Sequence, residues 1–458
     1  MDNLKPTALF LMSPAKGHLN ASFGLARNVA QNGYAVTYAA PFELHTYISQ
    51  QGFECIPFLG LPFGMNGEKT LDYLADSQRV KYFDNLIDRF YDTIYNARKT
   101  AIERLIQQTK PRLVLLDSFQ STDFILLYPL LKAQNIKFAF VQTMLSFHQQ
   151  ADNLPLDCAV LPHSKTNFGW YWRQYYFRRS LRSFWQSIIY LGRSNRRIIA
   201  QKAKMQELNT SYSLDYEQVF RVGFKNIPEL IIAPQALEFT DQKQPYQHYL
   251  GLMVDLERTE TSHDSFAFFL QSLPKHKKII YCSFGTLYGE FGNKKQLVSF
   301  FKNLLLAANQ LMDYEFVIGL SESFRKELSA LPSNVHVFET VPQIAVLKWS
   351  SLFITHGGLN SIKESLALSI PMLVYPVDKN WDQPSNAVKI AFHGLGLKGD
   401  LTKDTPTIIG QKINELLQNQ AFLEKIKTFK EAAKIQNDNF SVVDFITGVQ
   451  NTPRRVLG

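Results

Sequence analysis

Cysteine is scarce in this chain of 458 residues, which contains only Cys55, Cys158 and Cys282. These residues lie far apart and form no C-x-x-C pair. Such usage argues against a disulfide framework and against a zinc site, and it suits a reducing compartment. We therefore expect a fold stabilised by burial of its hydrophobic residues, which make up an ordinary 45% of the chain.

Long apolar runs are also missing. The first apolar run ends before Pro14, and no uninterrupted run reaches the roughly 20 residues that a membrane-spanning helix needs. From the sequence we expect neither a signal peptide nor an integral membrane segment. We expect a cytoplasmic location.

Acidic residues are absent from positions 158–206, which contain ten Lys or Arg residues. Arginines and aromatic residues are interleaved there, as is typical of a helix face on an anionic membrane, and residues 165–204 would then meet its inner surface. An amphipathic helix whose arginines extend over buried aromatic residues would give the same pattern, and this alternative stays open. No recognised nucleic-acid module surrounds the segment, so we expect no nucleic acid as a partner.

Apolar runs of strand length alternate with helical patterns over most of the chain. The expected strands are 8–13, 34–40, 53–58, 112–116, 137–142 and 230–233, and then 277–284, 315–320, 335–339, 351–355 and 371–376. A Gln-rich stretch at 235–249 separates the two sets and is expected to be a linker. The sequence therefore predicts an α/β fold of two doubly wound parallel-sheet, Rossmann-like domains, 1–235 and 249–424, that face a cleft.

The segment 340–386 has polar residues where a bound diphosphate would need them. An apolar strand pattern at 351–355 is followed within a few positions by a helical pattern. Between the two stand His356, Gly357, Gly358 and Asn360. The first N–H groups of a helix are unpaired and its N-terminus carries partial positive charge, so a diphosphate would be stabilised there.

A purely structural alternative exists for part of this motif. Ser361 and Glu364 have the S-x-x-E spacing of a capping box, in which both side chains would serve the helix end. Capping does not require the longer order found here, which is P-Q, twelve residues, H-G-G-x-N-S-x-x-E, six residues, P, and then D-Q. That order resembles the signature of the UDP-dependent glycosyltransferases, a family that includes plant secondary-product and macrolide glycosyltransferases.

The resemblance implies a UDP-sugar donor site on the second domain of a GT-B fold, with a C-terminal tail, 425–458, that packs back on the first domain. The implied contacts are Gln343 with uracil or ribose, His356 with the diphosphate, Gly358, Asn360 and Ser361 with phosphate oxygens, Glu364 with ribose hydroxyls, and Asp382 and Gln383 with the sugar. Ser283, Gly285 and Thr286 would form a second phosphate-contacting loop. The chain has no D-x-D sequence, so we expect no metal and no cofactor apart from the co-substrate.

Two positions depart from the plant form of this signature. Thr340 stands where the plant signature opens with a tryptophan that stacks on uracil, so the contact with the base must be weaker or come from elsewhere. The loop 376–383 is two residues longer and contains Trp381. Trp381 either walls the sugar pocket or shields a loop, and the sequence leaves both alternatives open.

A histidine and an aspartate in the first half are the expected catalytic pair. His18 follows the first strand, two residues before Asn20, which is a plausible helix N-cap. The G-H-x-N turn resembles the place where these enzymes keep their base, and imidazole accepts a proton near neutral pH. Asp117 ends another strand and would orient His18, although it could instead cap the next helix.

Together these features predict an inverting, metal-independent O-glycosyltransferase that moves a hexose, with glucose expected from the D-Q pair, to a lipophilic small molecule such as a flavonoid, terpenoid, carotenoid or macrolide. Phe119, Phe147 and the aromatic segment 170–185 are candidates to line the acceptor pocket. The alternatives are a peripheral membrane enzyme that glycosylates lipid, a UDP-sugar epimerase, and a non-catalytic accessory subunit of the same fold.

Overall fold

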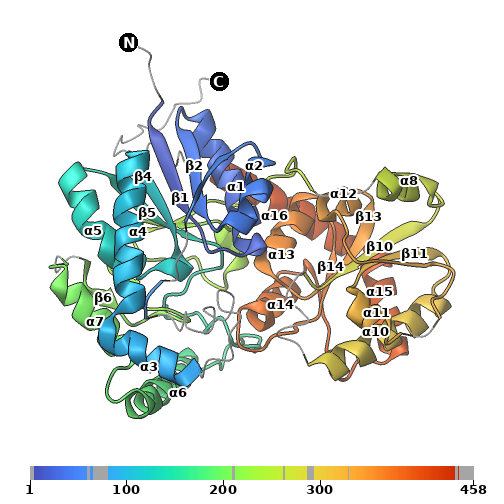
Figure 1. Ribbon diagram of the computed structural model, residues 1–458. Coiled ribbons are helices and arrows are strands. Elements are labelled where there is room, and N and C mark those ends of the chain that lie inside the picture. Colours follow the sequence, from blue (N-terminus) through green and yellow to red (C-terminus); the bar gives the residue numbers. More distant parts are fainter. Residues whose placement is uncertain are drawn as a thin grey trace, which may run out of the picture.

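The computed structural model describes residues 5–58, 62–64, 81–208, 212–260, 264–285, 293–328, 330–438 and 442. Two lobes, each built on its own sheet, lie side by side (Figure 1). Thr286, which the sequence assigns to the second phosphate loop, lies outside the described residues.

The first lobe is built on a seven-stranded sheet in which every pairing is parallel. In spatial order its strands are β3 (Glu54–Pro57), β2 (Ala35–Ala40), β1 (Thr7–Leu11), β4 (Leu113–Asp117), β5 (Lys137–Gln142), β8 (Glu229–Ile231) and β9 (Gln247–Tyr249). Both faces of the sheet are buried. Alternate residues of β1 join different apolar clusters, Leu9 and Leu11 on one face and Ala8 and Phe10 on the other.

Helices cover this sheet and connect its strands. They are α1 (Lys16–Gln31), α2 (His45–Ser49), α3 (Lys81–Tyr91), α4 (Thr93–Thr109), α5 (Asp123–Gln134), α6 (Phe168–Ile189) and α7 (Asn195–Met205). A short antiparallel pair, β6 (Leu214–Asp215) and β7 (Gly223–Phe224), follows α7. Among the described residues, none of the helices combines the length and apolar character needed to cross a bilayer.

The second lobe has a six-stranded parallel sheet. Its spatial order is β12 (Val335–Phe338), β11 (Tyr314–Gly319), β10 (Lys278–Ser283), β13 (Ser350–Thr355), β14 (Met372–Val374) and β15 (Gly396–Lys398). Its helices are α8 (Asp264–Ser272), α10 (Lys294–Gln310), α11 (Glu322–Arg325), α12 (Gln343–Leu347), α13 (Leu359–Ala367), α14 (Gln383–Phe392) and α15 (Pro406–Gln418). The predicted class, two parallel-sheet α/β units, is confirmed.

The segment 235–249 is not simply a linker, and that expectation was wrong. It contains the short 3-10 helix η5 (Gln235–Leu237) and the edge strand β9, which pairs with β8. The Gln-rich composition misled because Gln247 is fully buried and hydrogen-bonded to Glu229 and Ser146. The first sheet therefore continues to Tyr249.

The chain returns to the first lobe near its C-terminus. Helix α16 (Gln420–Asp438) contacts η5 as well as α13 and α15. Val442 is fully buried in the same apolar cluster as Phe10 of β1. Two buried or half-buried ion pairs also join the lobes, Lys389 with Glu238 and Arg27 with Asp255, each at 2.6 Å.

Candidate functional site

His18 and Asp117 form a buried pair at the carboxyl ends of neighbouring strands. Asp117 is the last residue of β4, and His18 lies in the first turn of α1, directly after β1. Because β1 pairs with β4, the two side chains meet, with 2.7 Å between His18 Nδ1 and Asp117 Oδ2. The Asp117 side chain is fully buried, whereas that of His18 is 19% exposed.

Asp117 contacts His18 and also caps the helix that follows it, so the cap predicted as an alternative does not exclude the contact with His18. Oδ1 accepts the Phe119 N–H at 2.8 Å and caps the short helix that follows β4, and Oδ2 accepts the Ser13 N–H at 3.0 Å as well as meeting His18. The carboxylate thus fixes the Nδ1–H tautomer of His18, which leaves Nε2 as the proton acceptor. Thr143 adds a hydroxyl 3.0 Å from Nδ1.

The expectation that Asn20 caps α1 was wrong. The helix already begins at Lys16, with Ala15 at the N-cap and no side-chain cap. Asn20 instead accepts a hydrogen bond from the hydroxyl of Tyr47. His18 is therefore a helical residue of the first turn rather than a loop residue.

The electrostatic surroundings favour the protonated form of His18. Burial by itself would lower the pKa of His18, but the charge and hydrogen bond of Asp117, together with the charge of Asp382, raise the pKa above its ordinary value. Asp382 belongs to the second lobe. Its effect on His18 shows that the expected base lies within electrostatic reach of the expected sugar-binding loop.

His356 lies between two glycine turns of the second lobe. It follows β13, and a Cβ added at Gly358 would come within 2.6 Å of its Nε2, while one added at Gly285 would come within 3.1 Å of its Cε1. Ser283, the last residue of β10, leads into the Gly285 turn. Burial lowers the pKa of His356 to about 4, against a weaker opposing effect of the Ser283 backbone, so the imidazole is neutral near pH 7. Among the described residues, its buried Nδ1 has no hydrogen-bond partner.

Helix α13 begins at the place the sequence predicts but is capped differently. Its N-cap is Gly358, which makes no side-chain cap, so the alternative of a capping box formed by Ser361 and Glu364 was wrong. The Ser361 hydroxyl instead accepts a hydrogen bond from Gln343 Nε2 at 3.2 Å. The backbone N–H groups at the start of α13 thus have no side-chain cap, as a phosphate-binding helix end requires.

Glu364 is the centre of a buried cluster at the expected nucleoside position. Its carboxylate accepts hydrogen bonds from Gln343 Nε2 and Asn360 Nδ2, each at 2.6 Å, and it forms an ion pair with Arg258. Its side chain is fully buried. A ribose could therefore reach Glu364 only by exchanging with one of these partners.

Arg258 was missed by sequence reasoning. Besides Glu364 it pairs with Glu260 at 2.8 Å, and Glu260 accepts the backbone N–H groups of Ile344 and Ala345 at the start of α12. Gln51 of the first lobe holds the intervening Thr259 through both backbone groups, each at 2.9 Å. No sequence motif contains Arg258. The one signal in the sequence was Glu364, a carboxylate in the donor motif that requires a cationic partner if it is buried.

Asp382 and Gln383 lie at the start of α14, on the second lobe. Asp382 is almost fully buried and accepts a hydrogen bond from Asn386 Nδ2 at 2.8 Å; burial raises its pKa to about 6. Gln383 uses its amide oxygen to accept the N–H groups of Val377 and Asp378, at 2.9 and 3.0 Å. The Gln383 amide group is thereby oriented.

Trp381 contacts the first lobe. Its ring centroid lies 5.7 Å from that of Phe119 and 5.2 Å from that of Phe220, and Phe119 also packs edge-on against His18 and against Phe147. The Trp381 ring therefore packs in an aromatic cluster that reaches His18, and it does more than shield its own loop. Phe119 and Phe147 belong to this cluster, but Phe147 is fully buried in the apolar core and cannot line a pocket as it stands. Sequence reasoning missed Phe220.

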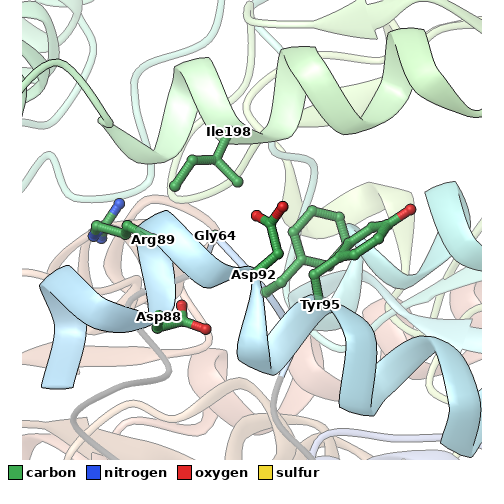
Figure 2. Close-up of a pocket in the computed structure, with 7 residues that line it drawn as sticks. Gly64, Asp88, Arg89, Asp92, Tyr95 and Ile198 are labelled. Carbon is green, nitrogen blue, oxygen red and sulfur yellow. The ribbon is translucent and has the colours of Figure 1, made fainter.

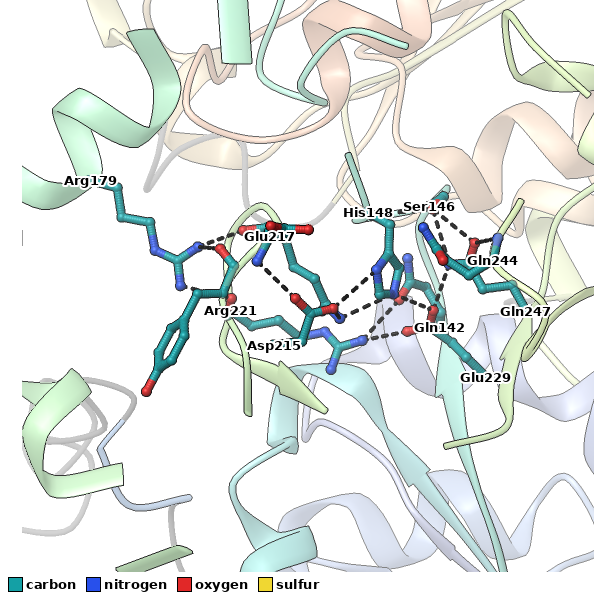
Figure 3. A network of polar contacts seen from close by, with 12 residues as sticks. Gln142, Ser146, His148, Arg179, Asp215, Glu217, Arg221, Glu229, Gln244 and Gln247 are labelled. Carbon is teal, nitrogen blue, oxygen red and sulfur yellow. Dashed lines mark hydrogen bonds and ion pairs between the residues drawn. The ribbon is translucent and has the colours of Figure 1, made fainter. Parts of the chain in front are cut away.

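A buried polar network surrounds His148 and Arg221 (Figure 3). His148 lies between Asp215 and Glu229, with ring nitrogens 3.3 Å from each carboxylate, and Arg221 pairs with Glu229. These side chains are almost fully buried and pair acidic with basic groups. The network therefore holds the segment that carries Phe220 in place.

A small hollow lies elsewhere, between α3, α4 and α7 (Figure 2). Asp88, Arg89, Asp92 and Tyr95 are among its lining residues. Lys202 pairs with Asp92 at 2.5 Å, and Arg89 donates to the Arg193 carbonyl at 2.8 Å. None of the expected site residues lines this hollow, and its polar groups serve to join helices.

The chain is similar to known proteins in sequence and in fold. Residues 303–444 match the family model described as "Erythromycin biosynthesis protein CIII-like, C-terminal domain". The chain is 31% identical over 173 residues to "Uncharacterized UDP-glucosyltransferase YdhE" of Bacillus subtilis (strain 168), which covers 38% of this chain and 42% of that protein. It is 20% identical over 434 residues to "NDP-glycosyltransferase YjiC" of the same organism, covering 92% and 91%.

The solved structure of the glycotransferase of kitacinnamycin superposes with a TM-score of 0.66 at 18% identity, over 94% of this chain and 96% of that one. This likeness shows that the fold is shared, so the GT-B fold implied by the sequence resemblance is confirmed. The alignment with YdhE spans about two fifths of that relative's length.

Proposed function

We propose that this chain, a relative of the GT-B glycosyltransferases, transfers a hexose from a UDP-sugar to a hydroxyl group of a lipophilic small molecule. The observation that carries the proposal is the His18–Asp117 pair, which lies across the lobe interface from Asp382 and Trp381. A base with a free Nε2 on one lobe thereby meets a sugar-binding loop on the other.

The proposed step is one displacement. The acceptor hydroxyl gives its proton to His18 Nε2 as its oxygen forms a bond to the anomeric carbon, and the bond from that carbon to the UDP oxygen breaks with its electron pair. Asp117 stabilises the imidazolium that results. A single displacement inverts the anomeric configuration, because the attack comes from the face opposite the leaving group.

The second lobe would stabilise the leaving diphosphate. The uncapped start of α13 offers N–H groups and a positive helix end, and neutral His356 can donate a hydrogen bond to phosphate oxygen. These donors are the reason why we propose a metal-independent reaction. Gln343 and Glu364 would meet the nucleoside, and Asp382 and Gln383 the hydroxyl groups of glucose.

The aromatic cluster supports a lipophilic acceptor. Phe119, Phe220 and Trp381 form an apolar wall beside His18, which would bind a flat or polycyclic alcohol by burial of apolar surface. Such a wall has little use in an epimerase or in an accessory subunit.

The test is release of nucleoside diphosphate from several UDP- and TDP-sugars, measured with and without a panel of phenols, terpenoids and macrolide aglycones. We expect release that depends on the acceptor, together with a glycosylated product in mass spectra. Turnover of the donor to a second sugar nucleotide without any acceptor would identify an epimerase instead and would contradict the proposal.

A further inference from the structure

Helix α6 carries its apolar side chains on the side that faces away from the protein. Five large residues are exposed by 46–69%: Phe177 (69%), Leu181 (46%), Phe184 (58%), Trp185 (54%) and Ile188 (52%). Their spacing of four, three, one and three residues puts them on one face of the helix. We call this set the α6 stripe. An amphipathic helix of a soluble domain ordinarily turns such a stripe inward.

The opposite face of α6 is firmly attached to the first lobe. Trp172 is buried and donates its Nε1–H to the Asn153 carbonyl at 2.7 Å. Arg179 points inward and donates to backbone carbonyls of the 216–221 segment at 2.6–3.2 Å. These contacts fix the rotation of the helix. The alternative in which arginines extend over buried aromatic residues is therefore wrong for this face, because the arginine is inside and Phe177, Phe184 and Trp185 are outside.

Helix α3 extends the apolar surface. It lies beside the end of α6 (Figure 1). Two hydrogen bonds join α3 to the turn after α6: Arg89 and Arg193 each donate to the other's carbonyl, at 2.8 and 2.7 Å. Ile87 and Tyr91 of α3 are exposed by 51% and 72%, and Leu191, which follows α6, by 67%. Exposed apolar side chains therefore occur on both of these neighbouring segments.

Helix α6 itself carries charge of one sign. Arg173, Arg178 and Arg182 are exposed on the flanks of the stripe, and no acidic residue occurs between positions 158 and 206. Arg178 has an acidic partner outside that range, Asp157, at 3.3 Å. A partner for this face must therefore offer both apolar surface and negative charge.

We propose that the α6 stripe docks on an anionic lipid surface. Phe177, Phe184 and Trp185 would enter the boundary between head groups and acyl chains, and the flanking arginines would meet lipid phosphates. A second copy of this chain fits less well, because symmetric packing of two stripes would bring the same arginines against each other without counter-charge.

The docked face also lies close to the proposed acceptor wall, a point that rests on the proposed function. The Tyr175 hydroxyl, on α6, accepts the Phe220 N–H at 2.8 Å, and Phe220 packs against Trp381. A lipophilic acceptor dissolved in the membrane would thus be delivered within one helix diameter of this wall. The docking itself is independent of any catalytic activity.

The experiment is co-sedimentation of the full chain with phosphatidylcholine vesicles, with and without phosphatidylglycerol, at low and high salt. Phe177→Glu is compared with Phe268→Glu on α8, because the two phenylalanines are exposed to the same extent, 69% and 70%. We expect the wild type and Phe268→Glu to bind anionic vesicles equally, and Phe177→Glu to lose at least about tenfold in affinity. Arg182→Gln should lose about fivefold at low salt, and high salt should remove that difference.

Circular dichroism and thermal unfolding serve as folding controls, and Leu181→Glu is the second variant should Phe177→Glu be unstable. Equal sedimentation of the wild type and both stripe variants would overturn the proposal, as would failure of the wild type to bind anionic vesicles. A wild-type dimer in light scattering that becomes monomeric in Phe177→Glu would also overturn it, since the stripe would then be an interface between two copies. None of these readouts depends on glycosyl transfer.

Discussion

Asp117 holds His18 Nδ1 at 2.7 Å with one carboxylate oxygen while its other oxygen caps the turn after β4. The helix cap fixes the carboxylate, and the carboxylate in turn fixes the tautomer of the imidazole. Orientation of the proposed base is thus built into the end of a strand rather than into a flexible loop.

This relationship predicts the behaviour of Asp117→Asn. Loss of the carboxylate leaves burial to dominate, so the pKa of His18 should fall. Turnover should drop by roughly 10²–10⁴-fold, because the tautomer and the imidazolium lose their support. For a base, the rate rises as pH rises through its pKa, which lies above 6.5 in the wild type, and the rising limb should move to lower pH in the variant. A pH–rate profile checks this; a limb that does not move would contradict the pairing.

The cluster around Glu364 predicts that nucleotide affinity depends on its charge. Glu364→Gln should weaken UDP binding by about 10–100-fold, since a charge-assisted hydrogen bond contributes roughly 1.5–3 kcal/mol. It should also lower the free energy of unfolding, because Arg258 is left buried and retains only Glu260 as a partner. Isothermal titration with UDP and urea denaturation measure the two effects. Glu327→Gln, in a half-exposed pair with Lys294, should change neither.

A glycine substitution tests His356. In Gly358→Ala, the new Cβ would come within 2.6 Å of His356 Nε2, so the imidazole must shift from the start of α13. We expect weaker UDP binding with the fold retained. Gly410→Ala is the matched control, because its Cβ meets nothing within 4 Å and α15 should gain about 0.5–1 kcal/mol. Equal UDP affinity in the two variants would mean that His356 does not contribute to the donor site.

The network of Figure 3 predicts a pH dependence of stability. Burial would raise the pKa of Glu229, but His148 and Arg221 lower it from 4.5 to about 2. Ionised Glu229 therefore stabilises the folded protein fully above pH 4.5, and this contribution is lost as pH falls towards 2. Burial would lower the pKa of His148, but Asp215 and Glu229 raise it above 6.5. Protonated His148 therefore stabilises the folded protein fully below pH 6.5, and this contribution is lost as pH rises through the folded-state pKa. The network should therefore stabilise most between about pH 4.5 and 6.5.

His148→Gln tests this window. At pH 5.5 the variant should unfold with a free energy roughly 3–5 kcal/mol below the wild type, because two buried carboxylates lose a cationic partner. The difference should shrink above pH 6.5. Urea denaturation across the pH range measures it, with the exposed His276→Gln as control. A constant difference at every pH would mean that His148 is neutral in the folded protein.

Much of the fold and the donor motif could be predicted because the signals are local. The turn from β13 to α13 is contained within a few residues, and its apolar strand, glycines and helix pattern are visible in order. His18 and Asp117 are 99 positions apart. Asp117 ends β4 and His18 follows β1, and because these strands are parallel neighbours the predicted topology already brings the two residues together.

The remainder depends on tertiary structure that no local pattern encodes. Arg258 reaches Glu364 across 106 positions because Gln51 and Glu260 hold its segment in place. The periodicity of α6 indicates an amphipathic helix but not which face turns inward. The inward face is fixed by the hydrogen bonds that Arg179 donates to backbone carbonyls of the 216–221 segment.

The most direct test of the central claim is a parallel measurement of turnover and UDP affinity in His18→Ala, with His276→Ala as control. If an imidazole on the first lobe deprotonates an acceptor while the second lobe binds the nucleotide, turnover should fall by roughly 10²–10⁴-fold with UDP affinity nearly unchanged. Full turnover in His18→Ala would contradict the account.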